Sequence, residues 1–66
     1  MEVRLNNKSL MLPHTMSVAE LMDMQNIPSA GTAVAVNGKI VRREDHDSRL
    51  LNEGDDSIVI SAAYGG

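Results

Sequence analysis

The sequence predicts an α+β domain in which a mixed sheet packs across one helix. Two observations carry this prediction. Short runs of β-branched and aliphatic residues are separated by turn residues such as the Asn37-Gly38 pair, as in a protein with several short strands. Residues 17–25 have instead the cap and the apolar spacing of a short helix. The expected order is strand, strand, helix, strand, strand, strand, which suits an α+β fold.

The first 13 residues predict a β-hairpin. Residues 2–6 alternate between polar and apolar, which is the period of a half-buried strand. Asn6-Asn7-Lys8 supplies the turn, because Asn tolerates left-handed backbone angles. Residues 9–12 then form the second strand, which Pro13 closes.

The helix is predicted from a capping box and an apolar stripe. Ser17 and Glu20 have the spacing at which a Ser side chain accepts from a free amide while Glu reaches back to the cap. Behind the cap, apolar residues at i, i+3 and i+4 share one face: Val18, Leu21 and Met22. We therefore expect a helix of about two to three turns that ends before Pro28.

The second half of the chain predicts a hairpin and a last strand. Residues 32–36 are rich in Val and Ala, and Asn37-Gly38 favours a type I′ turn into a return strand at 39–41, because that turn needs positive φ at both central residues. The last strand is expected at 57–61. Its run of Ile58-Val59-Ile60 leaves open which residues face the core, as in a central strand covered on both sides.

The connection between these two elements is highly charged. We expect residues 42–48 to form a loop or a single helical turn on a solvated face, with Leu50 and Leu51 anchoring it to the core. Composition requires that core to be aliphatic, since the chain has no Trp or Phe and one Tyr.

Composition also limits the function. Nine acidic residues outnumber six basic ones and stacking aromatics are nearly absent, which disfavours nucleic-acid binding. The net charge of −3 suits docking to a basic surface of another protein. The chain has no Cys, which excludes disulfides, thiolate metal sites and cysteine nucleophiles. No leader peptide and no apolar run of about 20 residues is seen, so we expect a cytoplasmic protein without a membrane span.

Residues suited to catalysis or metal binding are few. A metal site needs several ligands at defined spacing, and His14 and His46 are isolated, so we expect both to be surface histidines in polar loops. The serines have no acid–base neighbours that the sequence places beside them, which leaves nucleophilic catalysis unsupported. The sequence therefore predicts no metal, no catalytic residue and no enzyme activity of its own.

The end of the chain is the candidate functional segment. We expect a single domain at 1–66 with a flexible tail at 62–66 that ends in Gly65-Gly66. Glycine lets another backbone or a cofactor approach closely because it has no Cβ. If the last four residues are extended, they carry the terminal carboxylate on the order of 13 Å beyond the folded body. Ala63, Tyr64 and Gly65 would thus insert Gly66 into another protein's active site.

The chemistry of that terminus suggests sulfur transfer. A C-terminal carboxylate has a pKa of about 3.3–3.7, so at neutral pH it is an anion and a poor electrophile. Activation by a nucleotide would make it a mixed anhydride, and a persulfide sulfur would then convert it to a thiocarboxylate. A sulfur carrier without a thiol must hold sulfur at its end. The simpler alternative is a frayed or cut terminus that happens to be glycine.

Several short motifs together resemble the ThiS family of thiamin-biosynthesis sulfur carriers. The motifs are Val36-Asn37-Gly38 with Ile40-Val41, Arg43-Glu44, Asn52-Glu53-Gly54-Asp55 and Gly65-Gly66. The resemblance covers the whole chain and implies the β-grasp fold of ubiquitin-like proteins. It also implies that an ATP-using enzyme similar to the E1-like ThiF adenylates Gly66, that a persulfide donor supplies sulfur, and that a thiazole synthase similar to ThiG takes it. The carrier is then a co-substrate that binds no cofactor.

The sequence departs from this family at a few positions, and two alternatives stay open. His46 stands where a large apolar or aromatic residue is usual, Ser57 and Ala63 where Val or Ile is common, and Tyr64 is bulkier than usual before the glycines. One alternative is a carrier for molybdopterin synthesis similar to MoaD, although those chains are longer and have an aromatic-rich first strand. The other is a non-catalytic β-grasp interaction module whose terminus is never modified.

Overall fold

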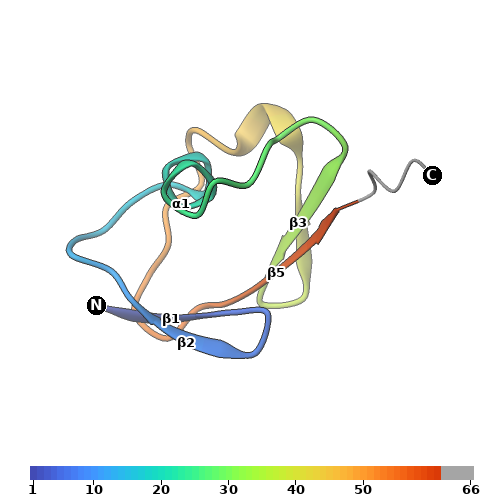
Figure 1. Cartoon of the computed structure of the whole chain (residues 1–66). Helices are drawn as coiled ribbons and strands as arrows, with labels where there is room; N and C mark the ends of the chain where they lie inside the picture. The colour runs from blue at the N-terminus through green and yellow to red at the C-terminus, as the bar shows by residue number, and fades with distance from the viewer. Residues whose placement is uncertain (62–66) are drawn as a thin grey trace.

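The computed structural model describes residues 1–61, in which one α-helix packs against a five-stranded mixed sheet (Figure 1). The predicted α+β class and element order are confirmed. In chain order the elements are β1 (Glu2–Leu5), β2 (Lys8–Met11), α1 (Val18–Met24), β3 (Thr32–Val36), β4 (Lys39–Val41), the 3₁₀ turn η1 (Arg43–Asp45) and β5 (Asp56–Ser61). The strands lie in the order β2-β1-β5-β3-β4. Strand β5 runs parallel to β1 and antiparallel to β3.

Both predicted hairpins are present and use two-residue turns. Asn6 and Asn7 have φ of 51° and 68°, and Asn37 and Gly38 have φ of 53° and 82°, as a type I′ turn requires. The second strand begins at Lys8 rather than at residue 9, because Lys8 pairs with Leu5 directly across the turn.

The capping box and the apolar stripe of α1 are as predicted. Ser17 Oγ accepts a 3.1 Å hydrogen bond from the Glu20 amide, and Glu20 Oε1 accepts one of 2.9 Å from the Ser17 amide. The helix is short, with two turns, and Asn26 follows it with a φ of 58°. Its apolar stripe contributes to an aliphatic core, as predicted, whose buried members are Val3, Leu12, Met16, Val18, Leu21, Met22, Val34, Val36, Val41 and Leu51.

The charged connection is anchored by one leucine, where the sequence suggested two. Leu51 is fully buried, whereas Leu50 is exposed. The backbone here is extended, because Leu50 forms a bridge with Ser17 and the Leu51 amide donates to the Met16 carbonyl at 2.9 Å. Successive side chains of an extended segment point to opposite sides, so only Leu51 can enter the core. The predicted single helical turn within 42–48 is present as η1. In the part of the chain that the structure describes, no helix is long and apolar enough to cross a membrane.

Candidate functional site

The candidate site starts at the end of β5. The predicted site residues Ala63, Tyr64, Gly65 and Gly66 lie outside the described residues, as does the predicted tail at 62–66. The described part of the site consists of the strand that leads to them and of the contacts that hold this strand in the sheet.

Strand β5 is paired on both sides at its start and on one side at its end. It pairs with β3 along its length, from Val36 opposite Ser57 to Thr32 opposite Ser61, but with β1 only at Asp56 and Ser57. The Val59 amide donates to the Asn6 side-chain oxygen at 2.8 Å, which ends the contact on that side. In Figure 1, β5 runs beside β3 and away from β1 and β2. The strand thus brings Ser61 past the end of β1.

The pairing with β3 shows which side chains of β5 face the core. Ser57 and Val59 face the core, since they pair with the buried residues Val36 and Val34 of β3. Ile58 and Ile60 point to the opposite face, where Ile60 is 60% exposed. Within the apolar run 58–60, Val59 therefore faces the core and the two isoleucines lie on the outer face. That face is open at Ile60, so the strand is not covered on both sides there.

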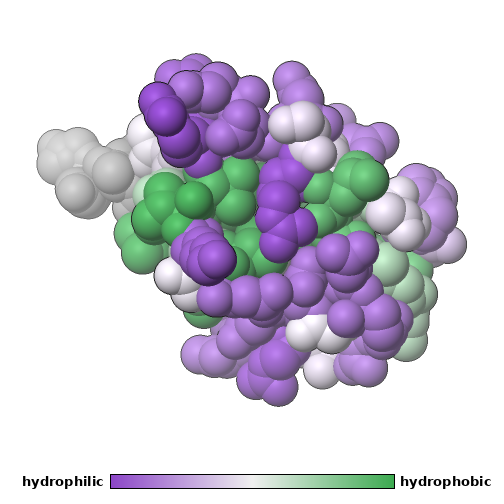
Figure 2. Space-filling view, turned by 180° about the vertical axis from the view of Figure 1, so that it is seen from behind, coloured by the Kyte–Doolittle hydropathy of each residue, from purple (hydrophilic) through white to green (hydrophobic). Residues whose placement is uncertain are grey.

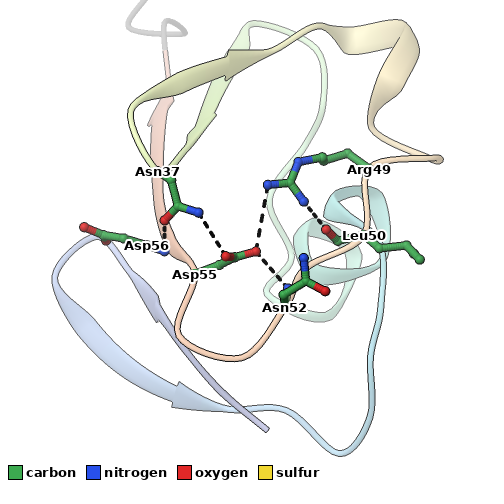
Figure 3. A network of polar contacts seen from close by, with 6 residues as sticks. All are labelled: Asn37, Arg49, Leu50, Asn52, Asp55 and Asp56. Carbon is green, nitrogen blue, oxygen red and sulfur yellow. Dashed lines mark hydrogen bonds and ion pairs between the residues drawn. The ribbon is translucent and has the colours of Figure 1, made fainter.

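A buried carboxylate fixes the start of β5 (Figure 3). Asp55 is buried, and its Oδ1 accepts a 2.9 Å hydrogen bond from Asn37 Nδ2 while its Oδ2 accepts one of 2.7 Å from the Asn52 amide. Arg49 lies 3.9 Å from Oδ2 and also donates to the Leu50 carbonyl. Buried charges are stable when they are paired and hydrogen-bonded in this way.

Asn37 also holds the first residue of β5. Its Oδ1 accepts from the Asp56 amide at 2.9 Å, and its own amide donates to the Asp56 carbonyl at 2.8 Å. One side chain therefore ties the β3–β4 hairpin to the turn before β5. Sequence reasoning identified Asn37 as a turn residue and Asp55 as part of a motif, but it missed their contact. No local signal connects residues 18 positions apart.

The two histidines have different environments. His14 is exposed, as predicted, with Nδ1 at 2.9 Å from the Thr15 carbonyl oxygen. The prediction of a surface histidine at position 46 is wrong, because His46 is only 5% exposed. Its Nε2 lies 3.2 Å from the Val41 carbonyl oxygen, and its carbonyl accepts from the Ala19 amide at 2.9 Å. The His46 backbone thus contacts the first turn of α1, and the ring lies beside the end of β4. Within residues 1–61, no three His, Cys, Asp or Glu side chains are grouped to hold a metal.

One buried hydroxyl has no hydrogen-bond partner among the described residues. Ser57 is 1% exposed, and within residues 1–61 its Oγ makes no hydrogen bond. It sits on the core face of β5, between Leu5 of β1 and Val36 of β3. An unpaired hydroxyl in an aliphatic core lowers stability, so Ser57 is a weak point of the strand that leads to the tail.

A hollow of about 400 Å³ beside β4 is lined by both polar and apolar residues. The Ser48 hydroxyl donates to the backbone oxygen of Asp45 at 3.3 Å. Its proton is therefore not held by a side-chain base that could activate the oxygen as a nucleophile. The remaining lining residues are Val36, Lys39, Ile40, Val41, Asp45 and Arg49. The hydrogen bond of Ser48 therefore gives no support to a nucleophile in this hollow.

Comparison with known proteins gives consistent matches over the full chain. The model of the ThiS family matches residues 2–66. The sulfur carrier protein ThiS of Escherichia coli K12 is 27% identical over 66 residues, which is 100% of both chains. The crystal structure of the thiamine biosynthesis protein ThiS from Geobacter metallireducens superposes with a TM-score of 0.85 at 25% identity, again over 100% of both chains. This likeness shows the β-grasp fold expected from the resemblance. An NMR structure of a thiamine biosynthesis protein from the same organism has a TM-score of 0.83 at 23% identity and covers 100% of this chain and 88% of that one.

Proposed function

The chain belongs to the ThiS family and is a sulfur carrier of thiamin biosynthesis, and on this premise we propose that its sulfur is carried as a thiocarboxylate on Gly66. The observation that best supports this role is the placement of β5. The strand is fixed at its start by Asp55 and Asn37, and its last residue, Ser61, lies beyond the end of β1. Five residues, 62–66, follow it and end in two glycines.

Activation begins with the Gly66 carboxylate. One carboxylate oxygen attacks the α-phosphorus of ATP in the active site of an E1-like enzyme similar to ThiF, and pyrophosphate leaves. The product is an acyl-adenylate whose carbonyl carbon is electrophilic, because AMP is a good leaving group. ATP is thus a substrate of the partner, and the carrier needs no cofactor of its own.

Sulfur enters in two further steps. The terminal sulfur of a persulfide donor attacks the carbonyl carbon, and AMP departs with the electron pair of the broken C–O bond, which leaves an acyl disulfide. A thiol then attacks the donor's sulfur, and the electron pair of the broken S–S bond goes to the sulfur on Gly66. The thiocarboxylate is released, while the thiol and the donor are left joined as a disulfide.

The carrier acts as a co-substrate in this scheme. A thiazole synthase similar to ThiG would transfer the sulfur to its substrate, and an oxygen atom from that substrate or from water would replace it on Gly66 to give the carboxylate again. The catalytic groups thus belong to the partners. The tail residues Ala63, Tyr64 and Gly65 would lie in the partner's channel, where glycine permits close approach. The cytoplasm stays the predicted compartment for this scheme.

Intact mass analysis tests the proposal. The chain is incubated with ATP, an E1-like enzyme of proven activity and a persulfide donor, and we expect one terminal oxygen to be replaced by sulfur. Oxidation of one of the five methionines adds nearly the same nominal mass. The sulfur must therefore be assigned by a C-terminal fragment ion or by reaction with an alkylating reagent. The matched control omits ATP. An unmodified terminus in the complete mixture would rule the proposal out.

A further inference from the structure

Asn6 contacts β5 through both its backbone and its side chain. Its backbone amide donates to the Ser57 carbonyl at 2.9 Å, and its side-chain Oδ1 accepts from the Val59 amide at 2.8 Å. In a parallel ladder, one residue donates to the neighbouring strand and its own carbonyl accepts from the residue two positions farther along that strand. Asn6 meets Ser57 and Val59 in this register. Its side-chain oxygen therefore takes the place of a backbone carbonyl and continues the ladder beyond β1.

The turn between β1 and β2 explains why a side chain has this role. β1 ends at Leu5, and Asn6 has a φ of 51° in the two-residue turn that follows, so the backbone leaves the direction of the strand there. Glycine would tolerate this φ as well as Asn does. Asn adds an oxygen at the end of a short side chain. The turn alone does not need that oxygen, so its contact with β5 is what distinguishes Asn from Gly at this position.

The last part of β5 has few other contacts on this side. Beyond Ser57, the bond from Val59 to Asn6 is the one hydrogen bond among residues 1–61 that holds β5 from the side of β1. On its other side β5 pairs with β3 along its length. Packing holds Ile60 weakly, because it is 60% exposed on the outer face of the sheet. Figure 2 shows hydrophobic residues exposed among hydrophilic ones on the side of the molecule turned away in Figure 1.

We propose that Asn6 is a positioning residue of the carrier, whose side-chain oxygen fixes the direction in which β5 presents the end of the chain to the adenylating enzyme. This inference rests on the proposed function. Without the Asn6 bond, β5 beyond Ser57 would be held by β3 alone and would take a wider range of directions at Ser61. A smaller fraction of carrier molecules would then be ready to bind in the productive orientation, which weakens the apparent affinity in proportion.

The test compares Asn6→Gly with Asn6→Asp. Both residues tolerate the positive φ, but only Asp keeps an acceptor for the Val59 amide. ATP–pyrophosphate exchange is measured with the purified adenylating enzyme over a range of carrier concentrations. We expect Asn6→Gly to raise the half-maximal concentration by about two- to tenfold, the factor by which one hydrogen bond biases an equilibrium, and to leave the maximal rate nearly unchanged. Asn6→Asp should restore a value near that of the wild type.

Asn7→Gly is the matched control, because it makes the same substitution one residue farther along the same turn. Asn7 also has a positive φ, and within residues 1–61 its side chain makes no hydrogen bond. We expect its half-maximal concentration to equal that of the wild type. Equal increases for Asn6→Gly and Asn7→Gly would overturn the proposal, and so would an Asn6→Asp chain as weak as Asn6→Gly.

The half-maximal concentration distinguishes positioning from a role in stability alone. A chain that loses the stability of one hydrogen bond is still almost entirely folded at the assay temperature, so its concentration of native carrier hardly changes. Urea denaturation of each variant verifies this under the conditions of the exchange assay. An increase in the half-maximal concentration of a fully folded Asn6→Gly chain therefore supports positioning.

Hydrogen exchange tests the contact itself without the enzyme. In ¹⁵N-labelled wild-type chain, we expect the Val59 amide to exchange at least about tenfold more slowly than in an unstructured peptide. Asn6→Gly should remove most of this protection and Asn6→Asp should keep it. Exchange of the wild-type Val59 amide at the unprotected rate would overturn the proposal, even if Asn6→Gly failed to fold.

The exchange assay also separates this inference from the function on which it rests. If folded wild-type and Asn6→Gly chains give the same half-maximal concentration, positioning by Asn6 is wrong while the carrier function stands. If an enzyme of proven activity gives no exchange with wild-type chain, the carrier function is wrong, and the positioning role is wrong with it.

Discussion

Asn37 Nδ2 donates a 2.9 Å hydrogen bond to Asp55 Oδ1, across 18 positions of sequence. The same Asn37 side chain accepts from the Asp56 amide. The β3–β4 hairpin and the start of β5 are therefore held by one amide group. Because β5 leads to the tail, this contact links the most recognisable hairpin signal of the sequence to the strand that positions the functional segment.

The first prediction removes that side chain and keeps the turn. Glycine tolerates the positive φ of position 37, so Asn37→Gly deletes two side-chain hydrogen bonds without straining the backbone. We expect the free energy of unfolding to fall by about 1–3 kcal/mol, because the Asp55 carboxylate loses a partner while it stays buried. Urea denaturation measures the change.

The control is Asn7→Gly, which makes the same substitution in the turn between β1 and β2. Asn7 also has a positive φ, but within residues 1–61 only its backbone oxygen is hydrogen-bonded, to Arg4. We expect a change within about 0.5 kcal/mol for this exposed site. Similar losses for both variants would show that the Asn37 side chain contributes nothing beyond its turn.

The second prediction concerns the coupling between Asn37 and Asp55. A double-mutant cycle with Asn37→Gly and Asp55→Ala should be non-additive by about 0.5–3 kcal/mol, since both single changes remove the same hydrogen bond. Strict additivity would mean that the two side chains stabilise the fold independently. A pair of Asn7→Gly and Asp55→Ala, which share no contact among the described residues, serves as the additive reference.

These contacts also show which features of the fold could be predicted from the sequence. The hairpins at Asn6-Asn7 and Asn37-Gly38 and the capping box at Ser17 were predictable, because each is specified by neighbouring residues. The burial of His46 was not, because it depends on how the turn after η1 meets α1. Local patterns specify elements, whereas contacts between elements depend on the register of the whole sheet.

The candidate site was likewise predictable only where local patterns specify it. The glycine pair at the terminus was visible in the sequence, and so was the strand before it. The open face of β5 was not, because a run of Ile58-Val59-Ile60 does not tell which side is covered. The pairings of Ser57 with Val36 and of Val59 with Val34 place Ile60 on the exposed outer face of the sheet.

The third prediction is a stabilising substitution in β5. The Ser57 hydroxyl is buried without a hydrogen bond in the described part of the chain, so Ser57→Ala should raise the free energy of unfolding by about 1 kcal/mol. The measurement is the midpoint of thermal unfolding. Ser9→Ala, on the exposed face of β2, should leave the midpoint nearly unchanged. A loss of stability in Ser57→Ala would indicate that the hydroxyl has an ordered partner such as a water molecule.

The fourth prediction compares the two histidines. His46→Ala removes a buried ring that lies within hydrogen-bond distance of the Val41 carbonyl, and we expect it to cost about 2 kcal/mol in unfolding free energy. His14→Ala removes an exposed ring and should cost less than about 0.5 kcal/mol. Chemical denaturation at one pH measures both. Equal and small losses would contradict the burial of His46.

The last prediction concerns the length of the tail. Deletion of Gly66 leaves a glycine carboxylate at the terminus, on Gly65, but the extended chain becomes about 3.3–3.6 Å shorter. Misplacement of reacting atoms by about 1 Å can cost a factor of 100, so we expect thiocarboxylate formation to be abolished while the unfolding midpoint is unchanged. Tyr64→Ala keeps the length and should retain activity. If the shortened chain were activated as fast as the wild type, the terminus would not be held at a fixed distance from Ser61. The partner would then recognise a glycine carboxylate alone, whatever its distance from the folded domain.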